Sequence, residues 1–249
     1  ISDLGNKSFY EFIIKKKSKF NNYKNLIRII IKLQNIKPKR TYHFGKYKIN
    51  FQNYSIKNLH KESDLFFDWY LQHCLKSSKQ KKIKNILKKE LTKVYKKLYF
   101  KNTVFVHRDF HASNIMVNKN KLGLIDSQDA IIGNPLYDLA SLIDDVRIKL
   151  PSNLQERLFN FYYSKSKLKK EQYKNLKNDF EILSVQRNLK ILGIFVRLFK
   201  RDGKPNYLKY LPYTWRLIER RLKNPVFENF NLMLKKYLKI QKLKKINNL

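Results

Sequence analysis

Cysteine and long apolar segments are what this sequence has least of, and each shortage excludes a class of protein. Cys74 is the only cysteine in 249 residues, which excludes an intrachain disulfide and a zinc site built from several cysteines. The longest apolar candidate starts at Ile191 and ends before Arg197, far short of the roughly 20 residues that span a bilayer. No signal-peptide pattern is visible. We therefore expect a cytoplasmic protein with no membrane partner.

Acidic residues are also scarce. The chain has 19 Asp and Glu residues against 55 Lys and Arg residues, for a net charge of +36. A surface of this charge attracts nucleic acid non-specifically. The lysines are nevertheless spread along almost every predicted helix, and alanine occurs only at positions 112, 130 and 140. We interpret the charge as a drift toward residues with A/T-rich codons at exposed positions, because charge alone specifies no partner.

One stretch of the chain carries a recognisable chemistry. It reads His107-Arg108-Asp109-Phe110-His111-Ala112-Ser113-Asn114 and is followed by Gly123-Leu124-Ile125-Asp126. An aspartate, then an asparagine, then a second aspartate is the layout of a kinase catalytic loop with its metal-binding residues. In that layout Asp109 is the base beside the acceptor hydroxyl. Asn114 and Asp126 would ligate Mg²⁺ at the phosphates of ATP, since hard cations take oxygen ligands.

Apolar segments flank this loop and predict the fold around it. Residues 104–106, 115–117 and 122–125 are expected to be short buried strands that hold the loop rigid. A capping box at Ser8 to Glu11 predicts a helix start, and apolar residues from Tyr23 onward recur at helical spacing. Residues 37–60 are interpreted as a surface connection. Further helices are predicted over residues 63–76, 81–98, 135–143, 151–165, 170–200, 207–222 and 226–243. The predicted class is α+β, mainly helical with a small β element at the loop.

The residues that grip a nucleotide in a kinase are missing from this chain. Upstream of Asp109 the only glycines are Gly5 and Gly45, so no glycine-rich loop can cover the phosphates, and no strand-like segment presents a lysine to them. The chain also begins at Ile1 rather than at a methionine. We therefore expect a fragment that needs a missing N-terminal lobe as its partner and is inactive on its own.

Three further segments resemble a known family. Gly133-Asn134-Pro135-Leu136-Tyr137-Asp138-Leu139-Ala140, together with the loop above, is similar to the aminoglycoside phosphotransferase/choline kinase-like family. Within it, the closest likeness is to the bacterial N-acetylmuramate/N-acetylglucosamine anomeric kinases of cell-wall recycling. That likeness rests on Gly193-Ile194-Phe195-Val196-Arg197-Leu198 and Arg201-Asp202-Gly203-Lys204-Pro205. It covers nearly the whole chain and implies that residues 1–249 are a kinase-like C-terminal lobe that begins near the interlobe hinge.

The resemblance implies an ATP- and Mg²⁺-dependent kinase acting on a small-molecule amino sugar. Asp109 would be catalytic and Asn114 and Asp126 would bind metal. His107, Asp129 and Asp138 would support them, His107 and Asp138 by packing and bracing. One departure is Ser127, where relatives usually carry an aromatic residue. Two alternatives stay open: a kinase for aminoglycosides or other small alcohols, and a non-catalytic basic binding module or decayed kinase.

Overall fold

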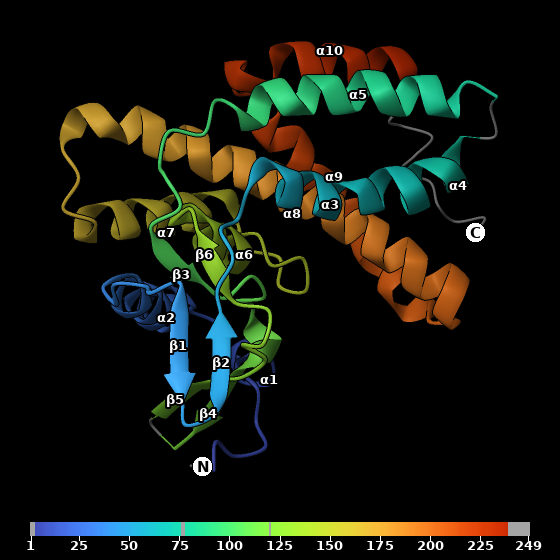
Figure 1. Ribbon diagram of the computed structural model, residues 1–249. Helices are drawn as coiled ribbons and strands as arrows, with labels where there is room; N and C mark the ends of the chain where they lie inside the picture. The colour runs from blue at the N-terminus through green and yellow to red at the C-terminus, as the bar shows by residue number, and fades with distance from the viewer. Residues whose placement is uncertain (1–2, 76–77, 120, 239–249) are drawn as a thin grey trace. The chain divides into compact units, whose positions relative to one another are not determined.

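The computed structural model describes residues 3–75, 78–119 and 121–238, without the side chain of Cys74 (Figure 1). Its contacts divide the chain into two compact units. Unit 1 comprises Ile1–Tyr54 and Phe100–Leu176, and unit 2 comprises Ser55–Tyr99 and Lys177–Leu249. The whole predicted catalytic loop lies in unit 1. In the described ranges no helix is both long enough and apolar enough to cross a membrane.

Unit 1 contains two small antiparallel sheets that frame the loop. Strand β3 (Val104–Val106) pairs with β6 (Ile131–Gly133), and β4 (Ile115–Asn118) pairs with β5 (Lys121–Leu124). The three predicted strands are therefore present, although most of their residues are half-buried rather than buried, and β6 was not predicted. Its three residues are too few to show a period, and pairing with β3 makes them a strand.

The segment before the first helix covers one edge of the β4–β5 pair. The backbone N–H of Val117 donates to the carbonyl of Lys7 at 2.8 Å, and the side chain of Leu4 lies against Gly123. A Cβ at position 123 would come within 2.5 Å of Leu4 Cδ2, so a larger residue there would force the Leu4 side chain to move. This packing fixes the strand that leads to Asp126.

α-Helices complete the described part of unit 1. The capping box predicted at Ser8 is present at the start of α1 (Phe9–Ile13), and the helix predicted from Tyr23 is α2 (Phe20–Gln34). Helix α2 buries four residues on one face, namely Tyr23, Leu26, Ile27 and Ile30. The helices predicted over residues 135–143 and 151–165 are confirmed as α6 (Leu136–Ile143) and α7 (Ser152–Lys165). Short 3-10 turns lie at Ala112–Asn114 and Lys170–Gln172.

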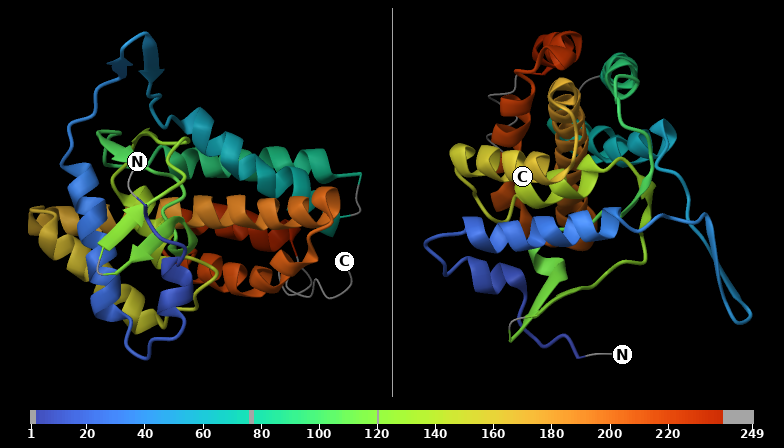
Figure 2. Two further views of the ribbon diagram at one scale, coloured as in Figure 1. Left: turned by 90° about the horizontal axis from the view of Figure 1, so that it is seen from below. Right: turned by 90° about the vertical axis from the view of Figure 1, so that its left-hand side faces the viewer.

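The interpretation of residues 37–60 as a plain surface connection was wrong. Strands β1 (Thr41–Phe44) and β2 (Tyr47–Asn50) form a hairpin that projects from the rest of unit 1 in both views of Figure 2. Gly45 turns it with a φ of 57°, a conformation that glycine adopts without strain. Because β2 is exposed along its whole length, no alternation of buried and exposed residues marked it in the sequence.

The regular elements in the described residues of unit 2 are all helices. A continuous helical run begins at Ile56, earlier than the predicted 63–76, and consists of α3 (Ile56–Leu65), a π-helix (Phe66–Leu71) and α4 (Gln72–Cys74). Helix α5 (Gln80–Tyr95) lies beside α10 (Glu228–Tyr237) in Figure 1. The other helices of the unit are α8 (Tyr173–Asp202, with its first turn in unit 1), α9 (Leu211–Arg221) and the 3-10 turns Pro205–Tyr210 and Pro225–Phe227. The end of the predicted helix 226–243 lies outside the described residues.

The π-helix and α8 cross with almost no space between their backbones. A Cβ added to Gly193 would lie 2.2 Å from the carbonyl carbon of Leu65, the residue that precedes the π-helix. Nearby, the indole N–H of Trp215 donates to the hydroxyl of Tyr70 at 2.6 Å, and both rings are fully buried. These contacts join the first and last thirds of unit 2 into one core. The helices and small sheets of the two units agree with the predicted α+β class, mainly helical.

Candidate active site

The loop from His107 to Asn114 connects β3 to β4 and is fastened by its own apolar residues. Phe110 and Ala112 are both fully buried. Two backbone hydrogen bonds shape the turn between them, from His111 N–H to the Asp109 carbonyl at 2.9 Å and from Asn114 N–H to the His111 carbonyl at 3.0 Å. The buried side chains hold the loop down, and Asp109, which directly precedes Phe110, is half-buried.

A carboxylate from α6 braces the start of the loop. Asp138 is 3% exposed, and its two oxygens accept hydrogen bonds from the backbone N–H groups of His107, at 2.8 Å, and Arg108, at 3.0 Å. Arg108 has a φ of 72°, which is uncommon for a residue other than glycine. Such backbone strain persists only where surrounding contacts enforce it, and it gathers at functional sites. Asp138 provides those contacts.

His107 links the loop to the segment that carries Asp126. Its Nε2 lies 3.0 Å from the carbonyl oxygen of Ile125, and a carbonyl can only accept, so Nε2 carries the hydrogen. Nδ1 is buried and has no hydrogen-bond partner among the described residues. Burial lowers the pKa of His107, against the opposing effects of the Ile125 carbonyl and the charges of Asp109 and Asp126. The ring is therefore a neutral strut between the two segments.

Asn114 brings the predicted catalytic and metal-binding segments together. Its amide nitrogen donates to the backbone carbonyl of Asp109 at 3.1 Å and to Oδ2 of Asp126 at 3.2 Å. Because both partners are acceptors, the orientation of the amide is fixed and the nitrogen faces them. The amide oxygen is then the atom of Asn114 that can serve as a ligand.

Asp126 is exposed and also has a left-handed backbone, with a φ of 66°. Its Oδ1 accepts a hydrogen bond from Gln128 Nε2 at 2.5 Å. One carboxylate and one amide oxygen suit Mg²⁺, which commonly takes a few protein oxygens and completes its shell with water and phosphate. In the part of the chain that is described, no group of three or more His, Cys, Asp or Glu side chains is arranged to hold a metal. These donors therefore suit a metal ion that also binds phosphate better than they suit a metal ion held by protein ligands alone.

The structure places Asp129 at the edge of this site through its backbone. Its carbonyl accepts a hydrogen bond from Arg108 Nη1 at 3.2 Å, and the Arg108 guanidinium also lies over the ring of Tyr54, with its carbon 6.0 Å from the ring centroid. The Asp129 side chain is exposed, as is Ser127, whose carbonyl accepts from Ala130 in a turn. The role of the Asp129 carboxylate stays a prediction.

Sequence reasoning missed one buried carboxylate of the loop. Asp145 is 1% exposed, and its Oδ2 accepts a hydrogen bond from the backbone N–H of Ala112 at 3.1 Å. Its Oδ1 accepts from the backbone of Arg147 at 3.1 Å and lies 3.3 Å from Arg147 Nη1. The only sequence signal was a pair of aspartates at 144 and 145 after an apolar helix.

Known proteins share both the sequence and the fold of this chain. The model of the phosphotransferase enzyme family matches residues 21–171. The chain is 32% identical over 165 residues to an N-acetylmuramate/N-acetylglucosamine kinase of Pseudomonas aeruginosa, a match that covers 65% of this chain and 49% of that protein. It is 28% identical over 216 residues to the protein of the same name from Neisseria meningitidis serogroup B, covering 85% of this chain and 63% of the relative. The matched part thus spans about half to under two thirds of the length of these relatives.

A solved structure has a similar fold. The choline/ethanolamine kinase family protein from Mesorhizobium loti superposes with a TM-score of 0.56 over 93% of this chain and 70% of that one, at 13% sequence identity. The mainly helical α+β arrangement with small sheets is therefore of a kinase-like kind. Since the family model also covers well over half of the sequence, including the whole loop and Asp126, this chain belongs to the phosphotransferase enzyme family.

Proposed function

We propose that this chain is the catalytic lobe of an ATP-dependent kinase that phosphorylates a sugar hydroxyl. The observation that carries the proposal is the double hydrogen bond of Asn114, which joins the backbone of Asp109 to the carboxylate of Asp126. The three residues that the motif predicts for base and metal thus lie in one site. Asp126 and Arg108, the residue before Asp109, both have left-handed backbones, and strain of this kind gathers at functional sites.

In this proposal Asp109 accepts or orients the proton of the acceptor hydroxyl. The bracing of its loop by Asp138 and Asp145 fixes where that carboxylate stands. Positioning matters because phosphoryl transfer leaves the protein little covalent chemistry to perform. A modest base suffices for an anomeric hydroxyl, which is more acidic than an ordinary alcohol.

Asp126 and the amide oxygen of Asn114 would hold Mg²⁺ together with the phosphates of ATP. The bound ion would neutralise charge on the transferring phosphate. Gln128 and His107 keep these ligands in place, Gln128 by donating to the Asp126 carboxylate and His107 by holding the carbonyl of the preceding residue. The residues that grip ATP are proposed to belong to an N-terminal lobe outside residues 1–249. We expect residues 1–249 to be inactive without it.

The acceptor is proposed to be an amino sugar, N-acetylmuramate or N-acetylglucosamine, in a cytoplasmic pathway of cell-wall recycling. Support comes from the names of the two relatives. Charge also favours it, because 55 basic against 19 acidic residues suit a neutral or carboxylate-bearing acetamido sugar better than a polycationic aminoglycoside. A kinase for aminoglycosides or other small alcohols is the runner-up.

The test is ADP release by the full-length protein with N-acetylmuramate, N-acetylglucosamine, choline and kanamycin in parallel. We expect turnover with an acetamido sugar and a loss of about 10²–10⁴-fold in Asp109→Asn, the usual contribution of a positioned base. Glu156→Gln, an exposed change on α7 of the same unit, is the matched control and should keep full activity. Turnover that survives Asp109→Asn would overturn the proposed base. Absence of turnover and of Mg-ATP binding would instead indicate the non-catalytic basic module, whose nucleic-acid affinity would fall steeply with salt and ignore Asp126→Ala.

A further inference from the structure

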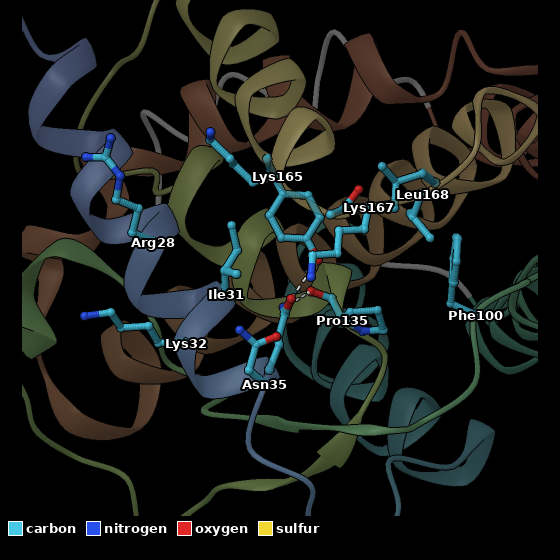
Figure 3. A pocket seen from close by; sticks show the side chains of 13 residues that line it. Arg28, Ile31, Lys32, Asn35, Phe100, Pro135, Lys165, Lys167 and Leu168 are labelled. Carbon is cyan, nitrogen blue, oxygen red and sulfur yellow. Dashed lines mark hydrogen bonds between the residues drawn. The ribbon is translucent and has the colours of Figure 1, made fainter.

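Unit 1 contains a cavity of about 490 Å³ that the proposed reaction does not use (Figure 3). Its walls come from the second half of α2, the C-terminal end of α7 with the residues after it, and the two single residues Phe100 and Pro135. The volume lies within the range of pockets that bury small ligands. The proposed base and metal ligands are not part of this wall, so the cavity is a separate site.

Basic side chains surround the opening. Arg28 and Lys32 come from α2, and Lys165 and Lys167 come from the end of α7. Figure 3 shows Arg28, Lys32 and Lys165 along one side, with Lys167 reaching in from the other. The residues that line the cavity include no aspartate or glutamate. A ligand in the opening would therefore meet positive charge from several directions, which favours an anion.

Much of the cavity wall is apolar, and the polar side chains of Gln34 and Tyr162 in it have hydrogen-bond partners. Ile31, Phe100, Pro135, Leu168 and Leu176 supply the apolar wall. The hydroxyl of Tyr162 donates to Gln34 Oε1 at 2.8 Å, and Gln34 Nε2 donates to the carbonyl of Pro135 at 2.7 Å. The bottom thus needs no polar ligand atom, and it suits the face of a ring.

Lys167 also has an unusual backbone. It has a φ of 56° directly after the cap of α7, a position where glycine is favoured. A residue with a Cβ costs roughly 1 kcal/mol or more in this conformation. Lys167→Gly would therefore remove the charge without straining the backbone.

We propose that this cavity binds a cyclic phosphomonoester, a sugar or aromatic ring bearing one phosphate. The ring would lie against the apolar wall and the phosphate among the four basic side chains. Arg28 Nη1 donates to Asn25 Oδ1 at 2.7 Å, and the remaining N–H groups of its guanidinium can donate to phosphate oxygens. Inorganic phosphate has the charge but not the ring, and a neutral ring has no charge, so each should bind more weakly.

The proposal is tested by calorimetric titration of the full-length protein with phenyl phosphate, inorganic phosphate and benzyl alcohol. We expect phenyl phosphate to bind at least about tenfold more tightly than either of the other two, because it alone uses both parts of the cavity. Lys167→Gly should weaken it by about tenfold, while the melting temperature stays the same or rises as the strain is released.

Lys119→Gly is the matched control. Lys119 is an exposed lysine of the same unit with a φ of 53°, so the change removes the same charge and the same strain away from the cavity. It should leave phenyl phosphate binding unchanged. Leu168→Trp, which fills the cavity without changing charge, should abolish binding. Equal losses in Lys119→Gly and Lys167→Gly, an unaffected Leu168→Trp, or equal affinity for phenyl phosphate and inorganic phosphate would each overturn the proposal.

Discussion

The carboxylate of Asp145 accepts a hydrogen bond from the backbone N–H of Ala112 at 3.1 Å, and both residues are buried. Asp138 therefore holds the loop on the N-terminal side of Asp109, and Asp145 holds it on the C-terminal side. Asp145→Ala would leave a buried N–H without this acceptor, which costs about 1–3 kcal/mol. We expect the free energy of unfolding, measured by urea titration, to fall by that amount. Asp145→Asn keeps one acceptor oxygen and should lose less; equal losses in the two variants would exclude the hydrogen bond as the cause.

Asp138 is expected to affect turnover through the position of the loop. Asp138→Ala removes the acceptor of both the His107 and the Arg108 backbone N–H groups. A displacement of about 1 Å at a reacting group can lower a rate about 10²-fold, so we expect kcat of the full-length protein to fall by roughly 10–100-fold. KM for the proposed sugar acceptor should change little, because Asp138 is buried and acts through the backbone of the loop. The measurement is steady-state kinetics, and a change confined to KM would contradict a bracing role.

Gly193 is predicted to be intolerant of any side chain. Gly193→Ala would place a Cβ 2.2 Å from the Leu65 carbonyl group, and backbone atoms on both sides must then shift. Overpacking of this kind costs about 1–3 kcal/mol, measured as a lower urea midpoint. Gly203→Asn is the control, because position 203 is in open space with a φ of 64° that asparagine tolerates. A Gly193→Ala protein as stable as Gly203→Asn would show that α8 and the π-helix can separate freely.

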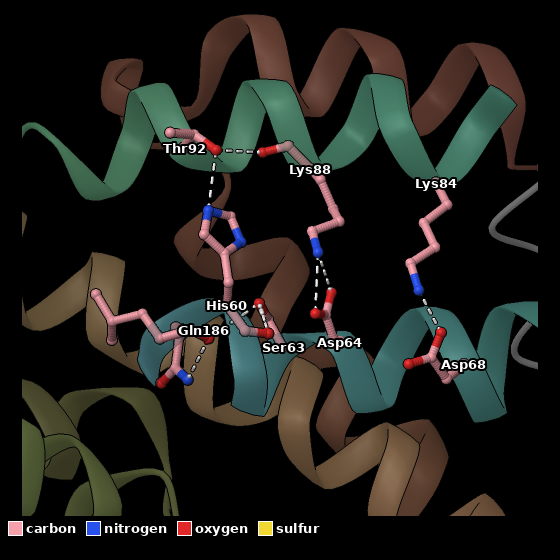
Figure 4. A network of polar contacts seen from close by, with 9 residues as sticks. His60, Ser63, Asp64, Asp68, Lys84, Lys88, Thr92 and Gln186 are labelled. Atoms are coloured by element: carbon pink, nitrogen blue, oxygen red, sulfur yellow. Dashed lines mark hydrogen bonds and ion pairs between the residues drawn. The ribbon is translucent and has the colours of Figure 1, made fainter. Parts of the chain in front are cut away.

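His60 is predicted to make the stability of unit 2 depend on pH. Figure 4 shows its polar contacts. The Thr92 hydroxyl donates to the Lys88 carbonyl at 2.8 Å, so it must accept from His60 Nε2, 2.9 Å away, and His60 carries its hydrogen on Nε2. Nδ1 is buried without a partner among the described residues. Burial lowers the pKa of His60 below its usual 6.5, the charge of Lys88 lowers it further, and that of Asp64 opposes the shift.

The direction of the pH effect follows from this lowered pKa. Below about pH 6.5 the unfolded chain binds a proton at His60 that the folded chain does not. His60 therefore does not lower the free energy of unfolding above that pH, and it lowers it increasingly as the pH falls. His107, with its pKa also lowered, acts in the same direction. We expect the free energy of unfolding to be smaller at pH 5.5 than at pH 7.5, and the difference to shrink in His60→Gln. A difference that is unchanged in His60→Gln would assign the effect to other groups.

Local sequence patterns were sufficient for much of the fold. The capping box of α1 depends on two residues only three positions apart. The apolar residues of α2 and α6 recur at helical spacing, so these features are visible without the rest of the chain. The β1–β2 hairpin was missed because its strands are exposed and carry no buried face. The start of the helix at Ile56 was missed because its cap, Ser55, lies within residues 37–60, which were interpreted as a connection.

The sequence by itself determined the chemistry that this chain can offer. The order Asp109, Asn114, Asp126 predicts a base and two oxygen ligands, and the shortage of glycine upstream of Asp109 predicts that no glycine-rich phosphate loop lies there. Only the tertiary structure decided how these groups are held. The contacts of Asp138 and Asp145 with the loop, and of His107 with Ile125, join residues far apart in the chain. Such contacts leave no local pattern, because a carboxylate buried against distant N–H groups reads in sequence like any other aspartate.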